Sequence, residues 1–70
     1  MMVEVFRTNI EEQSEAAALA ALLLRYYPGS KISFDLEDCD RILRIKSLFI
    51  NPESIEDLLA ENGYECTALE

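Results

Sequence analysis

The chain has 70 residues and a formal net charge of −8, from 14 acidic and 6 basic side chains. A chain of this length supports one small hydrophobic core, so we expect a single domain over residues 1–70. The acidic balance argues against nucleic acid and against anionic membrane surfaces, because binding to either needs an excess of Lys and Arg. It favours a partner with a basic surface, or a cation.

The apolar segments are short. The longest run, residues 16–24, spans nine residues, against roughly 20 for a membrane-spanning helix. The first four residues lack the basic region of a secretory signal. With only two cysteines in addition, we expect no membrane insertion, a cytoplasmic location and free thiols.

A helix is predicted over residues 10–27, where apolar side chains recur at helical spacing. Asn9 is placed to cap its first turn, and Glu12, three residues on, completes a capping box. Glu11 and Glu12 also put negative charge where the helix dipole favours it. A Pro-Gly pair directly after residue 27 ends the helix.

Four strands and a second helix complete the pattern. Apolar and polar residues alternate over residues 2–7, 31–36 and 41–47, and the last two of these ranges form a hairpin around a polar turn. Asn51 and the proline after it start a second helix. A last strand runs from Tyr64 to residue 69.

The element order βαββαβ predicts an α+β fold. Right-handed crossovers put both helices on one face of a four-stranded antiparallel sheet. The compact solution has strand order 4-1-3-2, a ferredoxin-like two-layer sandwich. The pattern within the first strand leaves the direction of Phe6 open. We expect the uncovered sheet face to allow a homodimer through a patch of Phe6, Ile42 and Leu69, and to carry Glu4, Phe6, Ser33, Ile42, Arg44, Thr67 and Leu69.

Several short stretches are similar to one family. Residues 7–10 read Arg-Thr-Asn-Ile, residues 34–36 and 41–43 read Phe-Asp-Leu and Arg-Ile-Leu, and residues 62–64 read Asn-Gly-Tyr. Through them nearly the whole chain resembles the heavy-metal-associated domain, the copper-chaperone type of ferredoxin-like module. The first loop of that family reads Gly-Met-x-Cys-x-x-Cys, or Lys-Thr-Asn-Ile-x-Cys-x-x-Cys in some bacterial members. Glu12 and Glu15 fall on its two cysteine positions.

This departure removes the metal site that the resemblance would imply. Cu(I) is a soft ion that prefers thiolates, whereas carboxylates are hard ligands, and the chain has no His. We therefore assign no metal and no cofactor to Glu12 and Glu15, and regard the chain as a degenerate member of the family. It also carries no catalytic triad and no Gly-rich phosphate loop, so we expect no enzyme.

The predicted topology gathers acidic side chains at one end, where the first loop, the hairpin turn and the loop after the second helix meet. Glu61 is expected to add to this charge. We expect the end to dock a protein partner with a basic surface through Asn9, Glu11, Glu12, Glu15, Glu37, Asp38, Cys39, Asp40 and Tyr64.

Metal handling is the alternative. A hard divalent ion would bind at the acidic end, or a soft ion would bind through Cys39 between two chains. Cys39 is expected to be exposed at the hairpin turn, and Cys66 is expected to pack as a small apolar residue.

Overall fold

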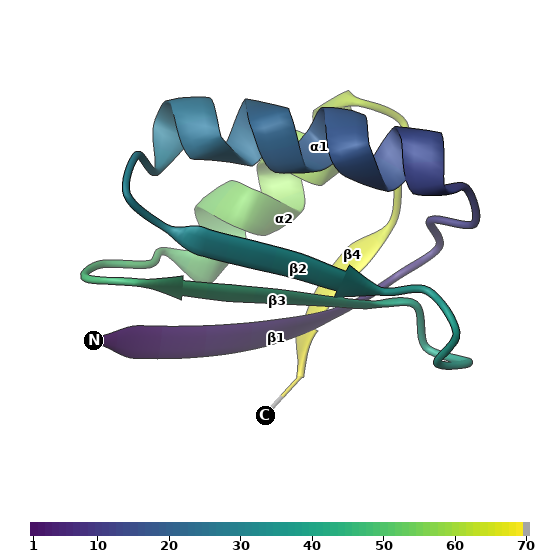
Figure 1. Cartoon of the computed structure of the whole chain (residues 1–70), viewed down its shortest axis with the longest axis horizontal. Helices are drawn as coiled ribbons and strands as arrows, with labels where there is room; N and C mark the ends of the chain where they lie inside the picture. The colour runs from purple at the N-terminus through teal and green to yellow at the C-terminus, as the bar shows by residue number, and fades with distance from the viewer. Residues whose placement is uncertain (70) are drawn as a thin grey trace.

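The computed structural model describes residues 1–69 as a sheet covered by two helices. Both helices lie on one face of the antiparallel sheet, and the other face is open (Figure 1). The fold is therefore a two-layer α+β sandwich. In chain order its elements are β1 Met2–Thr8, α1 Gln13–Tyr26, β2 Lys31–Asp35, β3 Ile42–Ser47, α2 Pro52–Glu61 and β4 Cys66–Leu69.

The strands are ordered β2-β3-β1-β4 across the sheet, which reads 4-1-3-2 from the β4 edge. The two central strands, β1 and β3, carry Phe6, Leu43 and Ile45, which are all fully buried. Phe6 pairs with Leu43 in the β1–β3 register. Burial of these large side chains accounts for the central position of the two strands, since a central strand is paired along both edges.

The core lies between the sheet and the helices. Apolar residues of α1 and α2 recur at helical spacing and face the inward side chains of the strands. Its buried members are Phe6, Ile10, Ala16, Leu19, Leu23, Leu43, Ile45, Ile50, Ile55 and Leu59.

Phe6 belongs to this core, so its expected place on the open face of the sheet is wrong. Side chains alternate along a strand, so Glu4 lies on the same side of β1 as Phe6 and also leaves the open face. Val3, Val5 and Arg7 take the open side instead. Burial of the larger Phe6 ring stabilises the fold more than burial of either valine would. This difference decides which face of the sheet each side chain of β1 occupies.

The first helix starts later than predicted. Its N-cap is Glu12, not Asn9, and α1 follows directly after it. Ile10 is fully buried, and its N–H donates to Thr8 Oγ1 at 3.3 Å, which holds the chain in a turn before the helix. The capping box is thereby displaced by three residues, so that Glu15 Oε1 accepts the N–H of Glu12 at 3.3 Å.

The second helix starts as the sequence predicts. Asn51 is its N-cap, and Asn51 Oδ1 accepts the N–H of Glu53 at 3.1 Å. The last strand begins at Cys66 rather than at Tyr64. Tyr64 instead closes the helix, because its N–H donates to the carbonyl of Leu59 at 3.0 Å.

Candidate functional site

Three connections meet at one end of the sandwich: the β1–α1 loop, the β2–β3 turn and the α2–β4 loop (Figure 1). Hydrogen bonds between residues far apart in sequence join the first loop to each of the other two. This end is therefore a connected surface, and it holds the residues that the sequence singled out.

Thr8 joins the β1–α1 loop to the β2–β3 turn. Its N–H donates to the carbonyl of Asp40 at 3.1 Å, and its hydroxyl donates to the carbonyl of Arg41. The same oxygen accepts the N–H of Ile10. Thr8 is the one buried polar residue among residues 1–69, and these bonds satisfy its polar groups in that position.

Asn9 joins the β1–α1 loop to the α2–β4 loop. Its Oδ1 accepts the N–H of Glu65 at 2.9 Å, and its Nδ2 donates to Glu65 Oε2 at 3.3 Å. Asn9 therefore positions two loops rather than capping the helix. No local pattern in the sequence indicates this role, because the partner lies 56 positions away.

Glu15 and Tyr64 make a second connection between the same two regions. The phenol of Tyr64 donates to Glu15 Oε2 at 2.9 Å, which raises the pKa of Tyr64 above its ordinary value of 10.0. The hydrogen bond is the main cause of this shift, because it favours the protonated phenol. Both side chains are partly buried. Their main role is therefore to connect α1 to the α2–β4 loop, and not to contact a partner.

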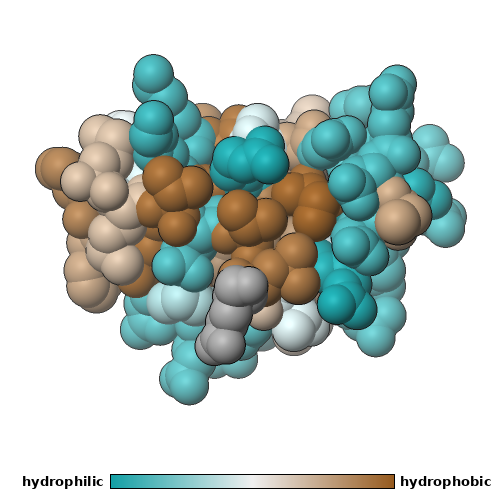
Figure 2. Space-filling view, turned by 90° about the horizontal axis from the view of Figure 1, so that it is seen from below, coloured by the Kyte–Doolittle hydropathy of each residue, from teal (hydrophilic) through white to brown (hydrophobic). Residues whose placement is uncertain are grey.

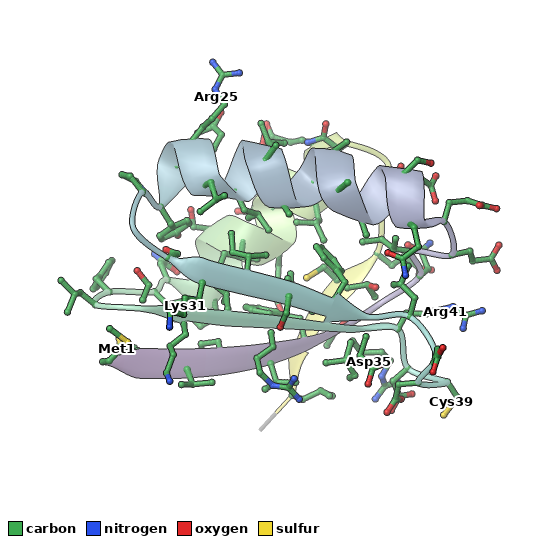
Figure 3. The ribbon with its side chains drawn as sticks, in the orientation of Figure 1. Met1, Arg25, Lys31, Asp35, Cys39 and Arg41 are labelled. Atoms are coloured by element: carbon green, nitrogen blue, oxygen red, sulfur yellow. The ribbon has the colours of Figure 1, made fainter. Side chains whose placement is uncertain are left out.

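The β2–β3 turn forms the tip of this end. The N–H of Asp40 donates to Asp38 Oδ1 at 2.9 Å, and Arg41 Nη1 donates to the carbonyl of Leu36 at 3.0 Å. Arg41 adopts a positive φ of 49°, so the turn closes through a left-handed residue. Cys39 projects from the tip into solvent (Figure 3).

The structure brings the predicted acidic residues together, with two changes. Glu65 joins them through its bonds to Asn9, while Glu61 lines a groove between the helices beside Tyr26 and Tyr27. Seven of the chain's 14 acidic residues thus lie here. We call this surface the acidic end, and it comprises Glu11, Glu12, Glu15, Glu37, Asp38, Asp40 and Glu65.

Little positive charge offsets the acidic end. Arg7 Nε lies 3.9 Å from Asp40 Oδ1, and both side chains are about half exposed; this is the only ion pair found within residues 1–69. An ion pair this exposed to water contributes little to the stability of the fold. The guanidinium of Arg41 is held at the carbonyl of Leu36. Glu11, Glu12 and Glu37 are exposed and remain available to a partner.

Three donor groups at the turn lie close enough to share an ion. One ligand atom each from Asp38, Cys39 and Asp40 lies within 4.8 Å of the others. However, Asp38 Oδ1 already accepts a backbone N–H, and Arg7 brings a competing positive charge to Asp40. Three donors also fall short of the four that zinc takes and the six or more that calcium takes. The turn alone therefore does not complete a metal site.

The two cysteines occupy different environments. Cys39 is exposed, whereas Cys66 packs against the core. Burial, with a smaller contribution from the nearby carboxylate of Glu56, raises the pKa of the Cys66 thiol to about 12. Cys66 is therefore a packing residue and does not join the candidate surface.

A groove between the two helices is the other concave feature of note. It encloses about 170 Å³, less than the roughly 300 Å³ at which small-molecule sites begin. Its position places it away from the acidic end. Its lining is Tyr26, Tyr27, Ser54, Asp57, Leu58 and Glu61.

Comparison of the chain with protein-family models, with curated proteins and with solved structures gives no match. Within the described part of the chain, neither helix has the length and apolar character needed to cross a membrane.

Proposed function

We propose that this chain is a non-enzymatic binding module of the cytoplasm, and that its acidic end docks a protein partner with a basic surface. We assign its sandwich to the ferredoxin-like class, to which the strand order 2-3-1-4 corresponds. We further propose that it is a degenerate relative of heavy-metal-associated domains, with Glu12 and Glu15 in place of the two cysteines.

One observation carries the docking proposal. The acidic end is fixed by hydrogen bonds that link loops distant in sequence, through Thr8, Asn9 and Glu15, while other carboxylates of the same surface stay exposed. A surface whose backbone is already ordered loses less conformational entropy when a partner binds. Its charge would steer a basic partner and raise the association rate.

The residues divide into two roles under this proposal. Glu11, Glu12, Glu37 and Asp38 are exposed and supply the contacts. Asn9, Glu15, Asp40 and Tyr64 shape the loops that present those contacts, and Cys39 projects from the β2–β3 turn into solvent.

A charge-reversal experiment tests the proposal. Glu11→Lys and Glu37→Lys are combined in one variant, which alters exposed contacts and leaves the N-cap Glu12 and the loop hydrogen bonds of Thr8, Asn9 and Glu15 in place. The control combines Asp57→Lys and Glu61→Lys on α2, exposed residues away from the acidic end. Quantitative affinity purification should show partners that the first variant loses and the control keeps. Equal retention by both variants would refute the proposal.

Metal handling is the second candidate, favoured by the spacing of Asp38, Cys39 and Asp40 at the β2–β3 turn. Two chains that each contribute these groups would supply enough donors for a zinc or copper ion. Calorimetric titration with Zn(II), Cu(I) and Ca(II) separates the candidates. Stoichiometric binding tighter than micromolar, abolished in Cys39→Ser, would support a shared site and overturn the docking proposal.

A further inference from the structure

The open face of the sheet has a composition unlike the rest of the molecule. It consists of the strand residues that alternate with the core residues. All four strands contribute residues to it, and the pairing of the strands sets the position of each residue. We call it the open face, and it comprises Val3, Val5, Arg7, Lys31, Ser33, Asp35, Ile42, Arg44, Lys46, Thr67 and Leu69.

Positive charge is concentrated on this face. Four of the chain's six basic residues lie on it, and within residues 1–69 the one carboxylate among its members is that of Asp35. All four are exposed, and Figure 3 shows Lys31 directed away from the helices. In a protein of net charge −8, the open face therefore has the opposite sign to the remaining surface. The basic residues are Arg7, Lys31, Arg44 and Lys46.

Apolar side chains fill the space between these charges. Val5 lies between Arg44 and Leu69 in the register of the sheet, and Arg7 pairs with Ile42. Figure 2 shows apolar side chains at the middle of the face and at the left edge of the view, with polar side chains mainly along the other edges. Neighbouring strands are about 4.8 Å apart. A charged side chain on one strand therefore lies within about one side-chain length of an apolar side chain on the next strand.

We infer that the open face is a second docking surface, and that its occupant is an acidic protein segment that also carries apolar side chains. Its carboxylates would pair with Arg44 and Lys46, and its apolar side chains would cover Val5 and Leu69. Apolar contact at the centre with charges around it is the usual anatomy of a protein interface. Because the charges across an interface are complementary, the basic open face favours a partner with negative charge.

A second copy of this chain is a poorer occupant. Face-to-face packing would bring the four cations of one copy against the four of the other, and like charges across an interface are unfavourable. The open face also lacks Phe6, the largest member of the apolar patch expected for a homodimer.

Single-stranded nucleic acid is a poorer occupant as well. Sheets that bind it offer aromatic side chains on which bases stack. Within residues 1–69, the aromatic residues of the strands, Phe6 and Phe34, both pack on the helix side. A phosphate backbone would also meet the large negative charge of the rest of the molecule.

The inference goes beyond the proposed function, because it uses a different surface and the opposite charge. An adaptor with an acidic end and a basic open face would hold two partners at once. The acidic end and the open face are tested with different substitutions. A negative result for one surface therefore leaves the proposal for the other unaffected.

Arg44→Glu combined with Lys46→Glu tests the inference, and the Arg25→Glu variant is the control. Arg25 is exposed in the last turn of α1 and points away from the sheet (Figure 3), so it changes charge without touching the open face. Three probes are titrated by fluorescence anisotropy and by amide chemical shifts. They are a peptide of repeated Asp-Leu-Glu-Val, its basic counterpart of repeated Lys-Leu-Arg-Val, and an oligothymidylate of similar length.

The acidic peptide should bind, with shifts centred on Val5, Arg44 and Leu69. The double variant should weaken its binding by about tenfold or more, the control by less than about twofold, and added salt should weaken it further. Thermal unfolding of each variant checks that it is folded. No acidic-peptide binding at millimolar concentration, equal loss in the control, preference for the oligothymidylate, or self-association through the open face in sedimentation would each overturn the inference.

Discussion

The phenol of Tyr64 donates a hydrogen bond to Oε2 of Glu15 across 49 positions of sequence. Oε1 of the same carboxylate accepts the N–H of Glu12 at the start of α1. Glu15 thus links the beginning of the first helix to the loop that follows the second. In heavy-metal-associated domains, of which we propose the chain to be a degenerate relative, the corresponding position holds a metal-binding cysteine. Here the carboxylate gives that position a structural role.

This contact should be visible in the titration of Tyr64. Its pKa is raised in the folded protein, so the phenol stays protonated above pH 10.0. Stability from the contact is fully present below the unfolded-state pKa of about 10, and it is lost as the pH rises through the folded-state value. Glu15→Ala removes both the acceptor of the hydrogen bond and the negative charge, so the pKa of Tyr64 should fall toward 10.0. Carbon NMR of the ring measures it, with Glu12→Gln as the variant that leaves the pKa unchanged.

Thr8 should be a strong determinant of stability for its size. Thr8→Val keeps the shape of the side chain but removes the donor to the Arg41 carbonyl and the acceptor for the Ile10 N–H. Loss of bonds by a buried group costs about 1–3 kcal/mol. Urea unfolding should show a loss in this range. Thr67→Val, on the exposed side of β4, should change the free energy of unfolding by less than about 0.5 kcal/mol, and an equal loss in both would contradict the bonding role of Thr8.

The two thiols should react at very different rates. The pKa of Cys66 is raised from 9.0 to about 12, which lowers its thiolate fraction at neutral pH by about a thousandfold. In a disulfide-exchange assay at pH 8, Cys66→Ser should keep a fast-reacting Cys39, and Cys39→Ser should leave only slow reaction until the protein unfolds. Fast reaction of Cys66 in the folded protein would contradict its partly buried position against the core.

The same shift gives a pH dependence of stability. Folding favours the protonated Cys66 thiol, so its contribution is fully present below pH 9 and is lost as the pH rises toward 12. Cys66→Ala should therefore reduce the loss of stability in this range. Thermal unfolding between pH 8 and pH 11, compared with Cys39→Ser, measures the difference.

The sequence predicted what depends on local pattern and missed what depends on distant contacts. Asn51 caps α2 as predicted because its partner lies two residues away. Asn9 has the same chemistry but bonds Glu65, and the burial of Ile10 moved the start of α1 to Glu12. A local motif cannot show that a polar side chain has a better partner elsewhere in the fold.

The open face illustrates the same limit. Alternation in β3 placed Arg44 and Ile42 on it from the sequence, and the register confirms that placement. In β1, residues 3, 5 and 6 are all apolar, so alternation alone left the direction of Phe6 undecided. Burial of its ring sends Arg7 to the open face, and the charge of that face emerges only after this choice.

The proposed relation to heavy-metal-associated domains can be tested by placing cysteines at positions 12 and 15. Glu12 is the N-cap of α1 and Glu15 lies one turn on, so Glu12→Cys with Glu15→Cys would put two thiols at a helix N-terminus. The helix dipole lowers the pKa of thiols there, and thiolates are the ligands that Cu(I) prefers. The double variant should bind one Cu(I) per chain tighter than micromolar in competition with a chelator. The unaltered chain should not.

A matched pair of cysteines distinguishes a restored site from two arbitrary thiols. Glu11→Cys with Ser14→Cys has the same spacing, and both residues are exposed, but the first precedes the N-cap of α1. Its Cu(I) affinity should be weaker by about tenfold or more, equivalent to about 1.4 kcal/mol. The restored pair should also lose the contact from Glu15 to Tyr64, so its thermal midpoint should fall and recover when Cu(I) binds. Equal affinities in the two pairs would mean that residues 12 and 15 hold no special geometry for a metal, and the resemblance would then be limited to the fold.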